Sequence, residues 1–111
     1  MLTAQEALIQ LQEGNQRFVE GKSTRNTNYT QRRNELVDGQ TPFAIILGCS
    51  DSRVPVEIVF DQGLGDLFVI RIAGNIVAPS QIGSIEFAVE TFQTPLVVVL
   101  GHTGCGAVAA T

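Results

Sequence analysis

The sequence has no tryptophan, a single histidine and only two cysteines among its 111 residues. No apolar run approaches the roughly 18 residues that a helix needs to cross a bilayer. The first stretch, MLTAQEALIQLQEG, carries acidic residues where a signal peptide would carry lysines. Basic residues are outnumbered, with seven Lys and Arg against eleven Asp and Glu, and they do not form a large cluster. These absences predict a cytoplasmic protein with neither a membrane nor a nucleic acid as its partner.

The two cysteines, Cys49 and Cys105, do not form a C-x-x-C redox pair. Without a secretion signal, a reducing compartment favours free thiols or metal thiolates over a disulfide. A hydrophobic content of 44% and a charged content of 16% are typical of a soluble globular domain, and the length allows one domain at most. Because the sequence ends in small, helix-compatible residues without a cap, we expect residues 1–111 to be the N-terminal portion of a single, incomplete domain.

Residues 1–40 are predicted to form a helical arm with little core of its own. The segment Thr3-Ala4-Gln5-Glu6 has the form of a capping box, and apolar residues then recur near helical spacing until Gly21. This pattern predicts a helix over about residues 4–20, with Ala7, Leu8, Leu11, Phe18 and Val19 as its apolar set. The segment YTQRRNELVDG predicts a short second helix that is stopped by Gly39. Such an arm packs either on a neighbouring subunit or across its own domain.

Residues 41–111 contain three continuous apolar runs bounded by glycine, which are FAIILG, DLFVIRIAG and PLVVVLG. Runs without alternation suit strands that are covered on both faces, as in a parallel sheet. Two helical segments separate the runs: PVEIVFDQG, with Pro55 in its first turn, and SQIGSIEFAVETF, with Ser80 as its N-cap. The second of these has an apolar stripe of Ile82, Ile85, Val89 and Phe92.

The resulting order is strand, helix, strand, helix, strand. It predicts an α/β fold with a mostly parallel sheet flanked by helices and preceded by the helical arm. Right-handed crossovers would place the C-terminal ends of the strands on one edge of the sheet, where open α/β sheets bind their ligands.

Polar motifs follow the first and the third predicted strands. CSDSRVP follows the first and GHTGC follows the third, so we expect Cys49 and Asp51 to lie close to His102 and Cys105. Two thiolates and one imidazole are a ligand set that Zn²⁺ takes in tetrahedral sites. The H-x-x-C spacing lets a tight turn supply two ligands, with the two glycines beside Cys105 removing obstructive Cβ atoms. Taken singly, each residue favours a structural role, but as a set they favour a metal site.

Three protein ligands leave a fourth position, for which Asp51 is the candidate. If Asp51 forms a bidentate ion pair with Arg53, the carboxylate is held off the metal and water takes the open place. If the pair breaks, Asp51 can become the fourth ligand and close the site. Zinc lowers the pKa of bound water to about 7 in well-tuned sites, although two thiolates should blunt this effect. Without a metal nearby, the two residues would form a surface ion pair worth under about 1 kcal/mol.

The motifs CSDSRVP and GHTGCGAV, together with DLFVIRIAGNIV and GSIEFAVE, resemble the β-class carbonic anhydrases over nearly the whole chain. The resemblance implies that Cys49, His102 and Cys105 bind Zn²⁺ and that Asp51 and Arg53 form the catalytic dyad. It implies the reversible hydration of CO2 to bicarbonate and a proton by a zinc-bound hydroxide. It also implies a homodimer or a higher homo-oligomer, with active sites at the subunit boundary and with the arm embracing a partner. Members of the family are considerably longer than this chain.

The resemblance further implies a substrate pocket of the plant-like kind. Gln40 matches a glutamine nine places before the first zinc cysteine, Phe68 matches an aromatic position, and Phe87 stands where a tyrosine is expected. Ile46 stands where the allosteric members of the family have tryptophan, which disfavours that kind. An apolar pocket suits CO2, and Gln40 could donate a hydrogen bond to one oxygen of it, whereas both phenylalanines equally fit a role in the core.

Two other functions would use the same residues. Hydrolysis of CS2 or COS, as in some relatives of this family, keeps the metal and changes the substrate. A non-catalytic, zinc-stabilised interaction module would instead keep Asp51 on the metal permanently. In every case the only histidine, His102, is occupied as a ligand, so a proton shuttle must come from elsewhere.

Overall fold

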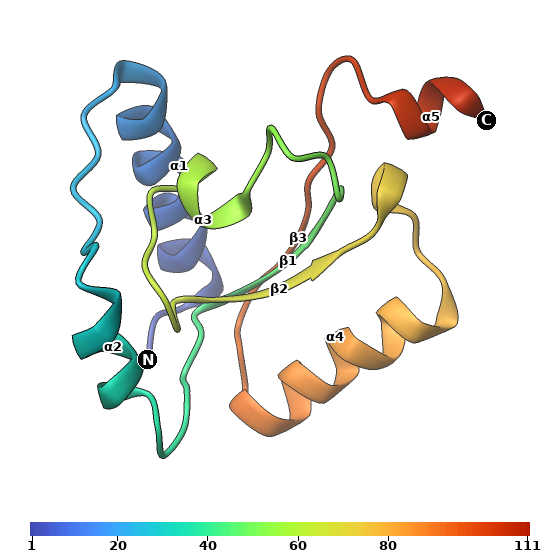
Figure 1. The fold of residues 1–111 in the computed structure, drawn as a ribbon. Helices are drawn as coiled ribbons and strands as arrows, with labels where there is room; N and C mark the ends of the chain where they lie inside the picture. The colour runs from blue at the N-terminus through green and yellow to red at the C-terminus, as the bar shows by residue number, and fades with distance from the viewer.

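Three parallel strands form one sheet in the computed structural model, which describes residues 1–111 (Figure 1). The strands pair in the order β2, β1, β3, and Ile46 at the centre of β1 lies opposite Val69 and Val98. Because all three strands run in the same direction, their C-terminal ends share one edge of the sheet. The prediction of an α/β fold with a parallel sheet is confirmed. The strands are β1 (Ala44–Gly48), β2 (Leu67–Arg71) and β3 (Val97–Val99).

Helices lie on both sides of the sheet (Figure 1). On one side α1 (Ala4–Glu20) contacts α3 (Val56–Val59), and on the other side α4 (Pro79–Phe92) contacts β1 and β2. Beyond the C-terminal edge, the 3-10 helix η1 (Ala73–Asn75) contacts α5 (Gly106–Ala110). None of these helices has the length and apolar character needed to cross a membrane.

The first helix of the arm has the predicted bounds, and the second is shorter than predicted. The capping box is present, because Thr3 Oγ1 accepts a hydrogen bond from the Glu6 amide at 3.1 Å and Glu6 Oε1 accepts one from the Thr3 amide at 2.9 Å. Helix α2 (Tyr29–Glu35) ends well before Gly39, where the prediction placed its stop. No residue of α2 is buried, so no packed face supports the additional turn.

Helix α1 packs on its own chain. Ala7, Leu11 and Gly14 are buried on the side that faces α3. A Cβ atom at position 14 would lie 1.8 Å from the Phe60 carbonyl oxygen, so only glycine permits this close approach. The rest of the predicted apolar set, Leu8, Phe18 and Val19, is exposed. One stripe of the arm is therefore occupied by the core, and the other apolar side chains face outward.

A buried carboxylate, Asp61, joins the arm to the core just after α3. Its side chain is fully buried and forms ion pairs with Arg17 of α1 at 2.7 Å and with Arg25 at 3.3 Å. It also accepts hydrogen bonds from the Ser23 hydroxyl and, at 3.0 Å, from the Thr24 amide. Burial by itself raises the pKa of Asp61, but these donors outweigh burial and hold the pKa well below its usual range. Asp61 is therefore an ionised anchor for the link between α1 and α2.

The core lies between α1, α3 and the sheet. Every residue of β1 is buried, as predicted for a strand covered on both faces. Strand β3 differs, because Val97 and Val99 are exposed although the run PLVVVLG predicted burial on both faces. Strand β3 lies at the edge of the sheet, and α4 packs on β1 and β2 instead. The buried cluster consists of Leu11, Ala44, Ile46, Val56, Phe60 and Leu67.

Helix α4 begins earlier than predicted. Ala78 is its N-cap, without a side-chain hydrogen bond, and Pro79 occupies the first turn. Ser80 is therefore not the cap; its hydroxyl donates to Gln81 Oε1 at 2.9 Å. Proline has no amide hydrogen and a fixed φ, which makes it suitable for the first helical position.

The predicted apolar stripe of α4 is only partly used. Ile82 and Val89 are exposed, whereas Gln81 and Ala88 are buried. A cluster of aromatic rings joins α4 to β2. The centroid of the Phe68 ring lies 6.0 Å from that of Phe87 and 5.8 Å from that of Phe92. Through these contacts Phe92, a member of the predicted stripe, packs against β2.

Candidate metal centre

The C-terminal edge of the sheet holds the three predicted metal ligands. Cys49 directly follows β1, whereas His102 and Cys105 lie in the turn between β3 and α5. One ligand atom from each of these side chains lies within 4.8 Å of the other two. Residues more than fifty positions apart therefore meet because β1 and β3 are parallel neighbours.

The two sulfur atoms have the spacing that a shared metal ion requires. Cys49 and Cys105 are free cysteines, and their Sγ atoms lie 3.9 Å apart, so they are not joined by a disulfide. Two thiolates bound at about 2.3 Å to one tetrahedral ion lie about 3.8 Å apart. The donor pair is thus arranged for a metal ion without rearrangement of the backbone.

The His102 imidazole presents a free nitrogen to the two sulfurs. Its Nδ1 lies 2.9 Å from the Thr103 carbonyl oxygen, so Nδ1 carries the proton and donates it there. Its Nε2 is buried and has no hydrogen-bond partner. A buried polar atom without a partner is costly unless a ligand satisfies it. The orphaned Nε2 therefore fits a metal ligand.

The surroundings of Cys49 favour the thiolate. The adjacent His102 imidazole is the largest cause, and with the backbone amides of Asp51 and Gly74 it lowers the pKa of Cys49 to about 6. In return, the adjacent Cys49 side chain is the main cause that raises the pKa of His102. Since the thiolate is the form that binds metals, the site is prepared for a cation near neutral pH.

In the turn that carries His102 and Cys105, glycine serves the backbone conformation and is not needed to make room for neighbouring atoms. Gly104 has φ of 66°, in the left-handed region that favours glycine. A Cβ atom at Gly104 or at Gly106 would have no neighbour within 4 Å, so the expectation that these glycines remove obstructive atoms was wrong. What Gly104 provides is the left-handed turn that directs Cys105 back toward Cys49.

Asp51 and Arg53 form a bidentate ion pair next to the ligands. Arg53 Nε donates to Asp51 Oδ1 at 2.9 Å, and Arg53 Nη2 donates to Oδ2 at 2.7 Å. These hydrogen bonds hold the pKa of Asp51 well below its usual range, and Asp51 in turn raises the pKa of Arg53. Asp51 Oδ2 lies 3.8 Å from His102 Nε2, so the carboxylate borders the cluster while it is paired with Arg53. Of the two arrangements considered for Asp51, this structure has the ion-paired one.

A pocket of about 280 Å³ opens beside the ligands. Cys49, Asp51 and Cys105 line it together with small residues, which are Ser50, Ala73, Gly106 and Ala107. The pocket therefore combines two thiols and a carboxylate with small side chains that leave room for a small molecule.

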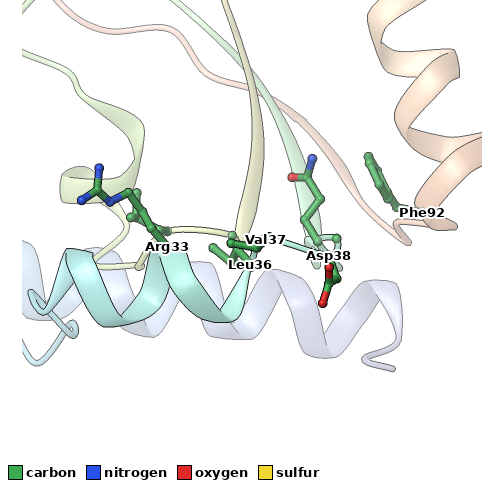
Figure 2. A pocket seen from close by; sticks show the side chains of 9 residues that line it. Arg33, Leu36, Val37, Asp38 and Phe92 are labelled. Atoms are coloured by element: carbon green, nitrogen blue, oxygen red, sulfur yellow. The ribbon is translucent and has the colours of Figure 1, made fainter.

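The largest pocket, of about 590 Å³, lies elsewhere and has a different lining. It is formed by the end of α2, the turn after it and the end of α4, and Phe92 lies across it from Leu36 and Val37 (Figure 2). It contains no thiol and no imidazole. Size alone therefore does not identify the reactive site, and the donor set favours the smaller pocket.

The predicted pocket residues Gln40, Phe68 and Phe87 share one neighbourhood, but it is not that of Cys49. Gln40 lines the large pocket with Phe92, whose ring contacts both other phenylalanines. Gln40 precedes the N-terminal end of β1 and Cys49 follows its C-terminal end. The five residues of β1 separate the two positions by roughly 15 Å. Within one chain, the structure does not bring these three residues to the metal ligands.

The structure adds two residues that the sequence patterns did not indicate. Arg71, at the end of β2, donates from Nε to the Cys49 carbonyl oxygen at 2.7 Å and from Nη2 to the Asp51 carbonyl oxygen at 2.6 Å. The Gly74 amide donates to Cys49 Sγ at 3.2 Å. One available signal was the charge of Arg71, since an arginine interrupts the otherwise apolar run DLFVIRIAG.

Taken together, the fold and the ligands define an α/β protein with a set of two thiols and one imidazole at the C-terminal edge of a parallel sheet. A family model described as carbonic anhydrase matches residues 44–111. The chain is 53% identical over 100 residues to Carbonic anhydrase 2 of Mycobacterium tuberculosis (strain ATCC 25618 / H37Rv). The matched region covers 90% of the chain and 48% of that relative. The chain belongs to the β-carbonic anhydrase family, as its motifs predicted.

Two solved structures extend this comparison. The chain is similar to tetrameric beta-carbonic anhydrases from the filamentous ascomycete Sordaria macrospora, with a TM-score of 0.67 and 36% identity over 74% of the chain and 46% of that structure. It is also similar to a carbon disulfide hydrolase, with a TM-score of 0.56 and 30% identity over 71% of the chain and 39% of that structure. The chain spans about half the length of the curated relatives that it matches.

Proposed function

We propose that the chain forms the zinc-binding part of an enzyme for the reversible hydration of CO2 to bicarbonate and a proton. One observation carries the proposal, namely that Cys49, His102 and Cys105 converge beside the ion pair of Asp51 and Arg53. The membership of the chain in a family whose curated relatives are carbonic anhydrases supports it.

Zinc is the metal that this donor set favours. Two soft thiolates and one imidazole suit Zn²⁺ in tetrahedral geometry, and the spacing of the two sulfurs agrees with that geometry. When bound with one open position, zinc lowers the pKa of water so that hydroxide is available near neutral pH. Cys49 and Cys105 supply negative charge to the ion, and His102 completes the protein ligands through Nε2.

Asp51 acts as a fixed hydrogen-bond acceptor at the edge of the site. Its low pKa keeps it ionised, so it accepts a proton in a hydrogen bond and does not donate one. It thereby orients the attacking oxygen toward CO2, while Arg53 holds the carboxylate away from the metal position. Arg53 Nη2 also lies 3.4 Å from the Gly104 carbonyl oxygen, which links the two halves of the site.

We also propose a homodimer or a higher homo-oligomer in which Gln40, Phe68 and Phe87 serve the metal centre of a partner subunit. Their position at the opposite end of β1 from Cys49 supports this, because one chain cannot bring them to its own ligands. The outward-facing Leu8, Phe18 and Val19 of the arm suit a contact with that partner.

Hydrolysis of CS2 or COS is the second candidate function. The similarity to a carbon disulfide hydrolase favours it, because the same scaffold then carries a different substrate. The permanently closed interaction module is favoured less, since Asp51 is held by two hydrogen bonds from Arg53.

Metal analysis combined with substrate assays tests the proposal. The purified full chain is expected to retain zinc after dialysis, to catalyse CO2 hydration above background in a stopped-flow indicator assay, and to lose this activity when a chelator removes zinc. CS2 and COS are assayed in parallel. Hydrolysis of either substrate without CO2 hydration would select the second candidate, and a protein without zinc would refute both.

Replacing Arg53 with alanine is expected to lower kcat/KM for CO2 by about 10- to 100-fold, the usual cost of losing a partner that orients a group at the metal. The reason is that Asp51 loses both side-chain hydrogen bonds and becomes free to approach the metal. Stopped-flow kinetics at matched zinc content measures the change. Lys22→Ala is the control, because it removes the same charge from an exposed position on the arm. Equal activity of the Arg53→Ala variant and the wild type would contradict a role for this pair in the reaction.

A further inference from the structure

Arg71 contacts the loop after β1, which carries the Cys49 thiol and the Asp51 carboxylate. It is the last residue of β2 and lies opposite Gly48 in the register of the sheet. Its Nε and Nη2 donate to the carbonyl oxygens of Cys49 and Asp51 at 2.7 and 2.6 Å. One guanidinium therefore bridges the two ends of a loop of three residues.

The two carbonyls belong to residues whose side chains have different tasks. Cys49 supplies a metal-binding sulfur, and Asp51 supplies the carboxylate that pairs with Arg53. The carbonyl carbon and the Cβ atom are bonded to the same Cα, so holding a carbonyl also limits where that side chain can point. The Arg71 side chain can thus set the relative positions of the thiolate and the carboxylate.

The contacts of Arg71 indicate positioning more than charge pairing. No carboxylate forms a salt bridge with Arg71, and both of its side-chain hydrogen bonds go to carbonyls of this loop. The planar guanidinium presents its N–H groups in a fixed fork, which the compact ammonium of lysine cannot reproduce. Three residues further along, the Gly74 amide donates to Cys49 Sγ at 3.2 Å, so the exit of β2 holds Cys49 at two atoms.

We propose that Arg71 is a positioning residue of the metal centre, which fixes the backbone of Cys49 and Asp51 through two hydrogen bonds from its guanidinium. This role rests on the proposed metal site, because Arg71 would fix the relative positions of the residues that form it. Arg71 contacts neither the metal position nor the substrate pocket, and its effect passes through the loop.

Two variants of the full chain test the proposal, Arg71→Met and Arg71→Lys. Methionine keeps the approximate length and removes every donor, whereas lysine keeps the charge and removes the fork. Both variants are expected to bind zinc about 10- to 100-fold more weakly than the wild type in competition with a chromophoric chelator. With Co²⁺ in place of zinc, both are expected to have shifted ligand-field absorption bands, because the sulfur and the carboxylate no longer keep their relative positions.

Urea unfolding of the metal-free proteins separates positioning from general stability. The midpoints of the variants and the wild type are expected to coincide, because Arg71 is an exposed residue outside the buried cluster. If the wild type binds no metal, the proposed function fails together with the inference. If the wild type binds metal and Arg71→Met has the same affinity and spectrum, only the inference is overturned. It is also overturned if lysine restores the wild-type values or if affinity falls only as far as stability does.

Discussion

Replacing Cys105 with serine is expected to remove zinc from the protein and, with it, CO2 hydration. The affinity should fall by more than the ~10- to 100-fold that the loss of an outer partner costs, because a direct ligand is lost. The remaining thiolate, Cys49, and His102 cannot form the set of three ligands that leaves a single open position. A hydroxyl also stays protonated at neutral pH, so serine does not restore the negative charge of the thiolate.

Zinc content after dialysis measures this loss, and cobalt substitution gives an independent signal. The absorption that arises from charge transfer between thiolate and Co²⁺ should weaken in Cys105→Ser and in Cys49→Ser alike. Ser52→Ala is the matched control, because its exposed hydroxyl follows Asp51 and forms no hydrogen bond within the chain. If Cys105→Ser kept full zinc content and full activity, the ligand set proposed for this protein would be wrong.

The sequence was sufficient to predict which candidate ligands converge, because it contains few residues of the relevant types. Two cysteines and one histidine leave little choice of soft donors, and the apolar runs before CSDSRVP and GHTGC indicate parallel strands. Parallel neighbours place their C-terminal ends together, so the convergence of Cys49, His102 and Cys105 follows from topology. Local patterns and one rule of chain connection were enough for this part of the structure.

Features that depend on tertiary packing could not be predicted in the same way. The apolar stripe of α4 was predicted only in part, because Phe92 packs against Phe68 of β2 while Ile82 and Val89 are exposed. The contacts of Arg71 were missed, since its acceptors are backbone carbonyls that have no sequence signature. Residue types therefore indicated the candidate metal ligands, while the contacts around them required coordinates.

The anchor at Asp61 belongs to this second class, and its loss is expected to have the second large effect. Asp61 lies 44 positions after Arg17 and 36 after Arg25, so no local pattern relates them. Asp61→Asn removes the charge while nearly preserving the volume. Arg17 and Arg25 then lose their anionic partner. The amide nitrogen of asparagine is a hydrogen-bond donor, and it would face donors of the arm where the carboxylate oxygen accepted their hydrogen bonds. Removing one partner of a buried ion pair costs about 3–5 kcal/mol of stability. Because both arginines are partly exposed, we expect the loss in Asp61→Asn to lie at the lower end of this range.

Urea unfolding followed by far-UV circular dichroism measures this loss of stability. Glu35→Gln provides the control, because it makes the same charge change in an exposed ion pair with Arg32 at 3.1 Å. Such a surface pair is worth under about 1 kcal/mol, so the control should unfold close to the wild type. Equal losses in the two variants would contradict the assignment of Asp61 as an anchor.

The same comparison made at several pH values distinguishes the charge of Asp61 from its shape. The pKa of Asp61 is lower in the folded chain than its usual value, so the ionised carboxylate favours the folded state. That contribution is complete above the ordinary aspartate pKa of about 4 and is lost as pH falls toward the folded value. The difference in unfolding free energy between the wild type and Asp61→Asn should therefore be constant from neutral pH down to about 5 and shrink below about 4. A difference that stays constant down to the most acidic measurable point would mean that packing of the carboxylate, and not its charge, fastens the arm to the core.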